Sequence, residues 1–202
     1  MDFVKEFAIF LQKSSAIKFG SFTLSSGKES AYYVDLRVVP SFPHEFRKMI
    51  KKLQDSIAEK IGLENFDYIA SVPTSGLVIA SALAMETVKP LIYIRQKPKE
   101  YGTGSLIEGK APSGSRILLV DDVGTTGQSL IKAIRALKEA GMVVTDAFVI
   151  INRLEGASKT LSSEGVRLHE ITDVLEISSS LWNEKLLDGP TLDRIKSQMG
   201  RA

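Results

Sequence analysis

An apolar run that ends in two consecutive acids constrains the fold of this chain more than any other feature. Residues 117–120 read Ile-Leu-Leu-Val without polar alternation, which is typical of a strand buried on both faces of a parallel sheet. Asp121 and Asp122 follow at once, and Gly-Thr-Thr-Gly at 124–127 precedes a helical pattern. A strand, a short polar loop and a helix in this order place backbone N–H groups and a helix N-terminus around a phosphate.

The loop differs from the two best-known phosphate loops. No lysine follows Gly127, as a P-loop requires, and acids occupy the turn where a dinucleotide fingerprint has glycines. Two carboxylates repel a bare polyphosphate, but they suit ribose hydroxyls or a divalent cation that already neutralises the phosphates. We therefore expect a sugar phosphate, with its ribose and any metal at Asp121 and Asp122 and its 5′-phosphate at residues 125–129. The simpler alternative is a strand that ends at Asp122 and a helix with Thr126 as its N-cap.

Composition limits the partners that the chain is expected to have. With 202 residues, 44% apolar and 25% charged, the chain can bury one substantial core. A net charge of +2 argues against a nucleic-acid partner. The absence of cysteine excludes thiolate chemistry and is compatible with the cytoplasm. Charged residues near the N-terminus argue against a signal peptide. The lack of an apolar run of about 18–20 residues argues against a membrane span.

The remaining patterns alternate between strands and helices. Helices are predicted over residues 2–15, 43–61, 77–88, 128–140 and 191–199, a hairpin over 19–35 with its turn near Ser26 and Gly27, and strands over 66–72, 91–94, 143–151 and 166–175. This order predicts an open, mainly parallel α/β sheet with helices on both sides. Ligands of such sheets bind at the carboxyl ends of the strands, where residues 73–76, 95–109 and 121–129 and Arg153 are expected.

Three stretches together resemble a known family. V-D-D-V-G-T-T-G at 120–127 resembles the ribosyl-diphosphate signature of the type I phosphoribosyltransferases. F-G-S-F-T-L-S-S-G-K-E-S-A-Y-Y-V-D at 19–35 and R-Q-K-P-K-E-Y-G-T-G at 95–104 narrow the resemblance to the orotate phosphoribosyltransferases within them. The similarity extends through Asn152 and Arg153 and covers most of the first 155 residues.

The resemblance implies a Rossmann-like sheet and a defined reaction. One domain would span residues 1–202, with a core at about 43–175 and a small hood formed mainly by 1–40 with a possible C-terminal contribution. The 5-phosphoribosyl group of 5-phosphoribosyl 1-diphosphate would pass to orotate with Mg²⁺, giving orotidine 5′-monophosphate and diphosphate in de novo pyrimidine (UMP) biosynthesis. The resemblance also implies a homodimer, in which residues 95–109, here called the lid, would close over the neighbour's site.

Site residues are carried over by position. Ribosyl diphosphate would contact Arg95, Gln96, Lys97, Lys99, Tyr101, Asp121, Asp122, Val123, Gly124, Thr125, Thr126, Gly127, Gln128 and Ser129. Lys99 and Asp122 would be catalytic. Thr125 and Arg153 would bind orotate, since an arginine can hold a carboxylate with two parallel hydrogen bonds. No residue is assigned as a direct metal ligand, and Mg²⁺ would be carried mainly by the ribosyl diphosphate, near Asp121 and Asp122.

The chain departs from the family pattern at four positions. Ser25, Ser75 and Gln96 stand where the family often has lysine, and Lys97 is the cation next to Gln96. Tyr101 stands where histidine is common, so an imidazole proton donor is not required. These departures affect how the diphosphate is held rather than the class of reaction.

Several alternatives stay open from the sequence. The acceptor could be uracil or a purine, or the protein could be a non-catalytic regulator that senses ribosyl diphosphate. Arg153 could cap a helix or pair with Glu155 instead of binding a ligand. Tyr32 and Tyr33 are as compatible with hairpin packing as with a wall for the base. His44 and His169 lack a ligand-spaced partner, so neither is given a role.

Overall fold

A six-stranded sheet forms the centre of the molecule. The computed structural model describes residues 2–23, 27, 29–97 and 106–199. The strands are β3 (Tyr68–Ser71), β4 (Leu91–Ile94), β5 (Ile107–Glu108), β6 (Arg116–Gly124), β7 (Val143–Asn152) and β8 (Arg167–Asp173), in the order β5-β4-β3-β6-β7-β8. Only the pairing of β4 with β5 is antiparallel. The predicted mainly parallel sheet is therefore confirmed.

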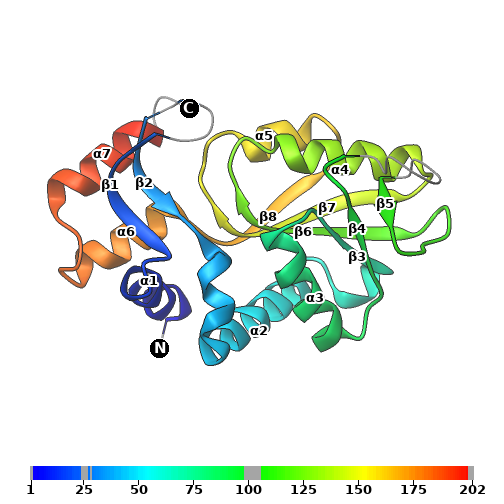
Figure 1. The fold of residues 1–202 in the computed structure, drawn as a ribbon, viewed down its shortest axis with the longest axis horizontal. Coiled ribbons are helices and arrows are strands. Elements are labelled where there is room, and N and C mark those ends of the chain that lie inside the picture. The colour runs from blue at the N-terminus through cyan, green and yellow to red at the C-terminus, as the bar shows by residue number, and fades with distance from the viewer. Residues whose placement is uncertain (1, 24–26, 28, 98–105, 200–202) are drawn as a thin grey trace.

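Helices cover both faces of this sheet (Figure 1). α2 (Pro43–Lys60) and α3 (Ser75–Thr87) lie on one face, and α4 (Gln128–Glu139) and α5 (Ala157–Ser162) lie on the other. Successive residues of β6 point into the two layers: Leu118 and Val120 join the core under α2 and α3, whereas Ile117 and Leu119 join the core under α4. Burial on both faces is the physical reason for the unbroken apolar run.

The direction in which the sheet grows reverses between β3 and β6. The chain passes from β3 to β4 on one side, and from β6 to β7 and β8 on the other. The two neighbouring strands, β3 and β6, are followed by α3 and α4, which leave toward opposite faces. A crevice opens at such a reversal, at the carboxyl ends of the strands. The sheet topology thus puts the acids of β6 at the place where open α/β sheets bind ligands.

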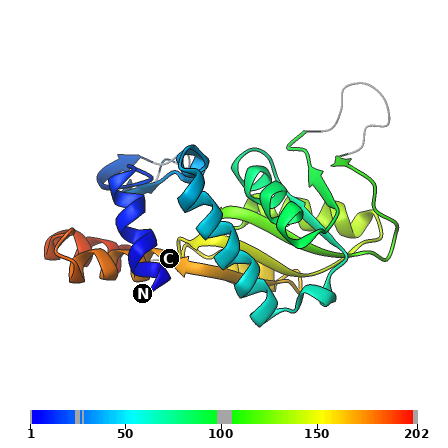
Figure 2. The ribbon, with the colours of Figure 1, turned by 90° about the horizontal axis from the view of Figure 1, so that it is seen from below.

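A second group of elements lies at one end of the sheet (Figures 1 and 2). It contains α1 (Phe3–Lys13), the antiparallel pair β1 (Ile17–Thr23) and β2 (Glu29–Val34), α6 (Val174–Asn183) and α7 (Gly189–Met199). We call this group the hood. Two 3-10 helices, Leu36–Ser41 and Leu63–Asn65, flank α2. α1 packs on α6 and α7 packs on β2, so the two ends of the chain build the hood together.

The structure differs from the sequence predictions at several places. β6 continues through both acids to Gly124 instead of ending before them, because it stays paired with β7 as far as Asn152. The short strand β5 lies within the lid, which was predicted as loop. Neither α5 nor α6 was predicted. Most of the predicted hairpin turn, including Ser26, lies outside the described residues. No helix in the described part of the chain has the length and apolarity to cross a membrane.

Candidate active site

The carboxylates of Asp121 and Asp122 stand at the carboxyl end of β6. Asp121 Oδ1 accepts a hydrogen bond of 2.9 Å from the backbone N–H of Asp122. Burial, and then the charge of Asp122, raises the pKa of the Asp121 carboxyl well above its usual value. Neither acid forms an ion pair with any described residue. A partly buried acid without a cationic partner among the described residues is a candidate functional group, because a ligand or ion can supply the missing charge.

Gly76 brings the start of α3 against Asp121. A Cβ atom at position 76 would lie 2.2 Å from Asp121 Oδ1 and 2.8 Å from Ser71 Oγ, so only glycine fits between them. The Ser71 hydroxyl is fully buried and has no hydrogen-bond partner among the residues that the structure describes. Buried hydroxyls are rarely left unpaired. This hydroxyl lies on the same side of Gly76 as Asp121, which has no cationic partner among the described residues.

Two helix N-termini without side-chain caps begin at the crevice. The N-cap residues, Thr74 for α3 and Gly127 for α4, make no side-chain hydrogen bond, and neither helix has an acid in its first turn. Thr126 is therefore not the N-cap, contrary to the simpler alternative. Gly127 has φ +80°, and a Cβ there would lie 2.8 Å from Leu161 Cδ1. The free N–H groups and the positive end of each helix dipole favour an anion.

The base of the lid and one side of α4, as far as Glu139, face a cavity of about 540 Å³. Arg95, Gln96 and Lys97 line it from the end of β4, and Ser129 and Lys132 line it from α4. Gln96 Nε2 donates a 3.0 Å hydrogen bond to the carbonyl of Pro73, which ties the lid to the loop before α3. Asp121, Asp122, Thr125 and Arg153 are not among the residues that line this cavity.

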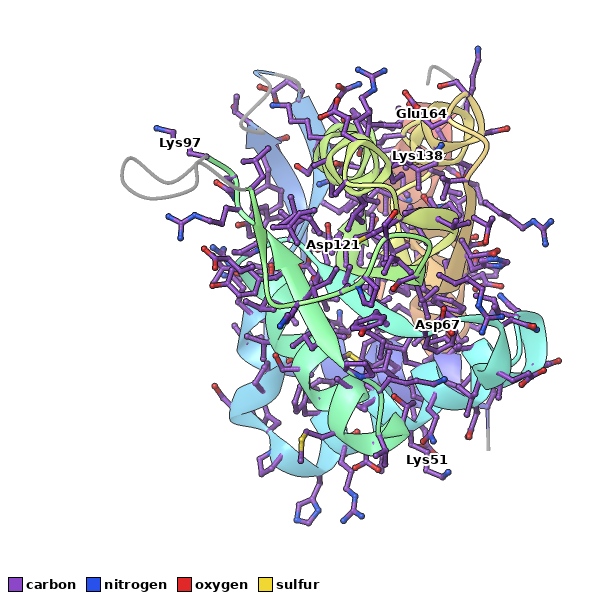
Figure 3. All side chains as sticks on the ribbon, turned by 90° about the vertical axis from the view of Figure 1, so that its right-hand side faces the viewer. Lys51, Asp67, Lys97, Asp121, Lys138 and Glu164 are labelled. Atoms are coloured by element: carbon purple, nitrogen blue, oxygen red, sulfur yellow. The ribbon has the colours of Figure 1, made fainter. Side chains whose placement is uncertain are left out.

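The lid residues described point in different directions. Arg95 Nη1 pairs with Glu108 Oε1 at 3.3 Å, so its guanidinium is engaged within its own chain. Lys97 projects from the surface, whereas Asp121 lies inside the molecule (Figure 3). The predicted roles of Lys99 and Tyr101, and the departure at Ser25, fall outside the described residues.

Arg153 lies directly after β7 and is nearly inaccessible. Its backbone N–H donates to the carbonyl of Gly124 over 2.8 Å, so it is fixed beside the end of β6. Its Nε and Nη2 atoms both donate to Glu155 Oε1, at 2.9 and 2.7 Å. The Nε–Nη2 side of the guanidinium is thus already occupied, and the pairing with Glu155 that the sequence left open is present.

The two neighbouring tyrosines and the two histidines lie in different surroundings. Tyr32 is fully buried beneath the guanidinium of Arg153, with 4.7 Å between the ring centroid and Cζ. Tyr33 packs within the hood against Phe22, with ring centroids 5.9 Å apart. His169 pairs with Asp146 at 2.7 Å in the sheet, and His44 is exposed. Sequence reasoning did not find the contact of Tyr32 with Arg153, because no local pattern signals contacts over 121 positions.

The fold and the site together are those of a protein of the phosphoribosyltransferase class. The sheet is mainly parallel, two acids lie at its topological reversal, two helix N-termini are uncapped, and a hood lies at one end. Residues 43–181 match the model of the phosphoribosyl transferase domain. Within that class, the chain belongs to the orotate phosphoribosyltransferase family. It is 50% identical over 198 residues to the orotate phosphoribosyltransferase of Cenarchaeum symbiosum, a match that covers 98% of this chain and 99% of that protein.

Solved structures agree with this assignment. The orotate phosphoribosyltransferase of Aeropyrum pernix superposes with a TM-score of 0.79 at 36% identity, covering 87% of this chain and 97% of that one. UMP synthase of Leishmania donovani gives a TM-score of 0.86 at 28% identity and covers the whole of this chain, which spans only 43% of that longer protein. The shared fold therefore includes both the core and the hood.

Proposed function

We propose that the protein transfers the 5-phosphoribosyl group from 5-phosphoribosyl 1-diphosphate to orotate, giving orotidine 5′-monophosphate and diphosphate in UMP biosynthesis. One observation supports this most directly: within the described part of the chain, Asp121 and Asp122 have no cationic partner, and they lie at the end of the strand that leads to the uncapped α4, with the start of the uncapped α3 against Asp121. Relatives that carry the name orotate phosphoribosyltransferase support orotate as the acceptor. The alternatives of uracil, a purine or a non-catalytic sensor have no comparable support.

The first part of the proposed mechanism is the binding of the ribose 5-phosphate. Its phosphate accepts hydrogen bonds from the N-terminus of α4, where Thr126, Gln128 and Ser129 are exposed. The ribose hydroxyls face Asp121 and Asp122. As diphosphate leaves the anomeric carbon, positive charge develops on the ribose, and two carboxylates in a dry site stabilise that charge. Asp122 is the proposed catalytic carboxylate, and it acts through its negative charge and not as a proton donor.

The second part is the departure of the diphosphate. The uncapped start of α3 and the lid residues Arg95, Lys97 and Lys99 supply donors and positive charge to the leaving group. Closure of the lid excludes water, which would otherwise capture the electron-poor carbon. Gln96 and Ser75 carry no charge, so the proposal assigns much of the neutralisation to Lys99 and to a metal ion.

The residues fit Mg²⁺ that arrives with its substrate. No cluster of three or more His, Asp or Glu side chains that could hold a metal exists among the described residues. Two neighbouring carboxylates without cations are hard oxygen donors, and they suit an ion that already has phosphate oxygens in its coordination sphere. Bound Mg²⁺ would neutralise charge on the diphosphate as it leaves.

Orotate is proposed to bind between Thr125 and Arg153. Thr125 lies at the end of β6 and its carbonyl accepts a hydrogen bond of 3.1 Å from Ala157 N–H, which fixes the loop. Arg153 would meet the carboxylate of orotate through the part of the guanidinium that Glu155 leaves free. The ring nitrogen of orotate is acidic enough to react without a strong general base, which fits a site that contains no histidine.

A homodimer is proposed because large apolar side chains are exposed on α3 and at its C-terminal end. Val78 and Met85 of α3 are 42% and 81% exposed, and Val88, its C-cap residue, is 90% exposed. Such a group of exposed large apolar side chains is typical of an interaction surface. The same helix begins at the candidate site, so a second copy on this face would lie close to the crevice. In such a dimer the lid of one subunit would close over the site of its neighbour. The proposed location is the cytoplasm.

The test is the reaction itself. Purified protein with orotate, 5-phosphoribosyl 1-diphosphate and Mg²⁺ is expected to consume orotate, measured as loss of its ultraviolet absorbance. The matched control omits the ribosyl diphosphate. Turnover of uracil or adenine in place of orotate would refute the assigned acceptor, and binding of ribosyl diphosphate without turnover of any base would support the sensor instead.

A further inference from the structure

The guanidinium of Arg153 is held by Glu155, two residues further along the chain, and by Tyr32 and Ser30 of the hood. Glu155 Oε1 accepts from both Nε and Nη2, and the side chains of Arg153 and Glu155 are only 6% and 15% exposed. The ring of Tyr32 lies beneath the guanidinium. Ser30 Oγ accepts a 3.3 Å hydrogen bond from Nη2. These contacts use the single donor of Nε and both donors of Nη2.

The hood fixes the residues that surround the guanidinium. The Tyr32 hydroxyl donates to Glu155 Oε1 over 3.2 Å, and burial raises the pKa of this tyrosine, so it remains a donor at neutral pH. Gln198 of α7 donates from Nε2 to Ser30 Oγ at 3.4 Å and accepts from the N–H of Ala31 at 3.0 Å. The C-terminal helix thus reaches the residues around Arg153.

We propose that Glu155 is a positioning residue for Arg153, supported from the hood by Tyr32 and Gln198. Arg153 has five N–H donors, and the two on Nη1 have no partner within the described part of the chain. Glu155 therefore leaves Nη1 as the end that meets the carboxylate of the base. This inference rests on the proposed function, because it takes orotate as the acceptor.

The charge of Glu155 gives the arrangement a consequence for specificity. Because Glu155 neutralises Arg153 at 2.7 Å, the base subsite offers directed donors without a net positive charge. A carboxylate placed to receive both Nη1 donors gains charge-assisted hydrogen bonds. A phosphate or diphosphate gains little from a neutralised pair, so the base subsite does not compete with the uncapped helices for the ribosyl diphosphate.

Two substitutions at position 155 separate positioning from folding. Glu155→Ala removes the acceptor, and the orotate KM is expected to rise roughly 10- to 100-fold, the equivalent of one charge-assisted hydrogen bond. The KM for ribosyl diphosphate and kcat are expected to stay within about threefold, because the lost interaction is made equally in the ground state and the transition state. Glu155→Gln keeps an oxygen acceptor and is expected to restore the orotate KM to within about fivefold of the unchanged protein.

Matched controls come from a surface pair and from the hood. Arg135 and Glu164 also form an arginine–glutamate contact of 2.7 Å, and Glu164 lies beside Lys138, away from Asp121 (Figure 3). Glu164→Gln is expected to leave both KM values unchanged. Gln198→Ala is expected to raise the orotate KM about two- to threefold without changing that of ribosyl diphosphate, because one neutral hydrogen bond to the supporting serine is lost.

Three results would overturn the positioning role. One is an orotate KM that does not change in Glu155→Ala. Another is a parallel rise of both KM values with a lowered melting temperature, which is what a buried ion pair with only a structural role would give. The third is a Glu155→Gln variant as impaired as Glu155→Ala. If Glu155→Ala does not fold, Glu155→Gln and Gln198→Ala still give the comparison of the two KM values. If the wild-type protein itself does not turn over orotate, the proposed function is refuted instead.

Discussion

Replacing Gly76 with alanine tests whether catalysis depends on the place of the Asp121 carboxylate. The new Cβ would lie 2.2 Å from Asp121 Oδ1, 2.8 Å from Ser71 Oγ and 3.1 Å from Asp121 Cα. The carboxylate would have to withdraw by roughly 0.8 Å to reach an acceptable contact of 3.0 Å. The contact of 3.1 Å with Asp121 Cα involves a backbone atom, so rotation of the Asp121 side chain alone does not lengthen it.

The effects on stability and activity have different expected sizes. Overpacking costs about 1–3 kcal/mol, and alanine in place of glycine within a helix returns about 0.5–1 kcal/mol. The net loss is about 0–2.5 kcal/mol, which for a domain of this size lowers Tm by at most about 10 °C. A displacement of about 1 Å at a reacting group can cost on the order of 100-fold in rate. Activity is therefore expected to fall far more than stability.

The measurement pairs kcat/KM for orotate turnover with thermal unfolding of the same preparation. Gly189→Ala is the matched control, because Gly189 also lies in the first turn of a helix and a Cβ there meets nothing within 4 Å. It is expected to keep full activity and to keep or slightly raise Tm. A Gly76→Ala variant with unchanged kcat/KM would refute the argument that Asp121 must keep this position.

Three further predictions follow from the site and from α3. Asp121→Asn is expected to raise Tm at pH 7 but not at pH 3. Because the pKa of Asp121 is raised in the folded protein, the folded state binds this proton more tightly than the unfolded state does. The stabilisation from the protonated acid is therefore present at low pH and is lost as the pH rises through the folded pKa. A lower Tm at pH 7 would contradict the burial of an unpaired charge. Lys99→Ala is expected to lower kcat by far more than it raises the KM for ribosyl diphosphate, since its charge matters most as diphosphate leaves, and unchanged kcat in steady-state assays would remove it from the mechanism. Met85→Glu is expected to convert a dimer to a monomer in light scattering, because it places a charge on the apolar face of α3, and a dimer that persists would place the interface elsewhere.

Local patterns were sufficient wherever neighbours in the sequence determine the structure. The run at 117–120 predicted a buried parallel strand, and β6 contains it. The spacing of Ile50, Leu53 and Ile57 predicted one face of a helix, and all three are buried in α2. The acids at 121 and 122 were located at the carboxyl edge of the sheet, although the strand continues through them, because pairing with β7 rather than local polarity decides where a strand ends.

The extent of the hood was beyond the sequence patterns. Residues 174–199 carry buried positions such as Val174, Ile177 and Leu181 at helical spacing, yet nothing local indicates that their partner is α1 at the other end of the chain. Such contacts form because each apolar helix face must be covered by another layer. The predicted roles of Lys99 and Tyr101 stay predictions.

The sequence by itself predicted a sugar-phosphate site, because a buried strand, two acids and a glycine-bearing loop before a helix lie within about 15 consecutive residues. The resemblance of three sequence stretches to a known family implied the class of protein. Tertiary structure alone decided how the site is completed. Only the approach of α3 to β6 brings Gly76 against Asp121. Only the packing of the hood on the core brings Tyr32 and Gln198 toward Arg153 and Glu155. These contacts join positions more than 40 residues apart, and they depend on how whole layers fit together, which no short pattern specifies.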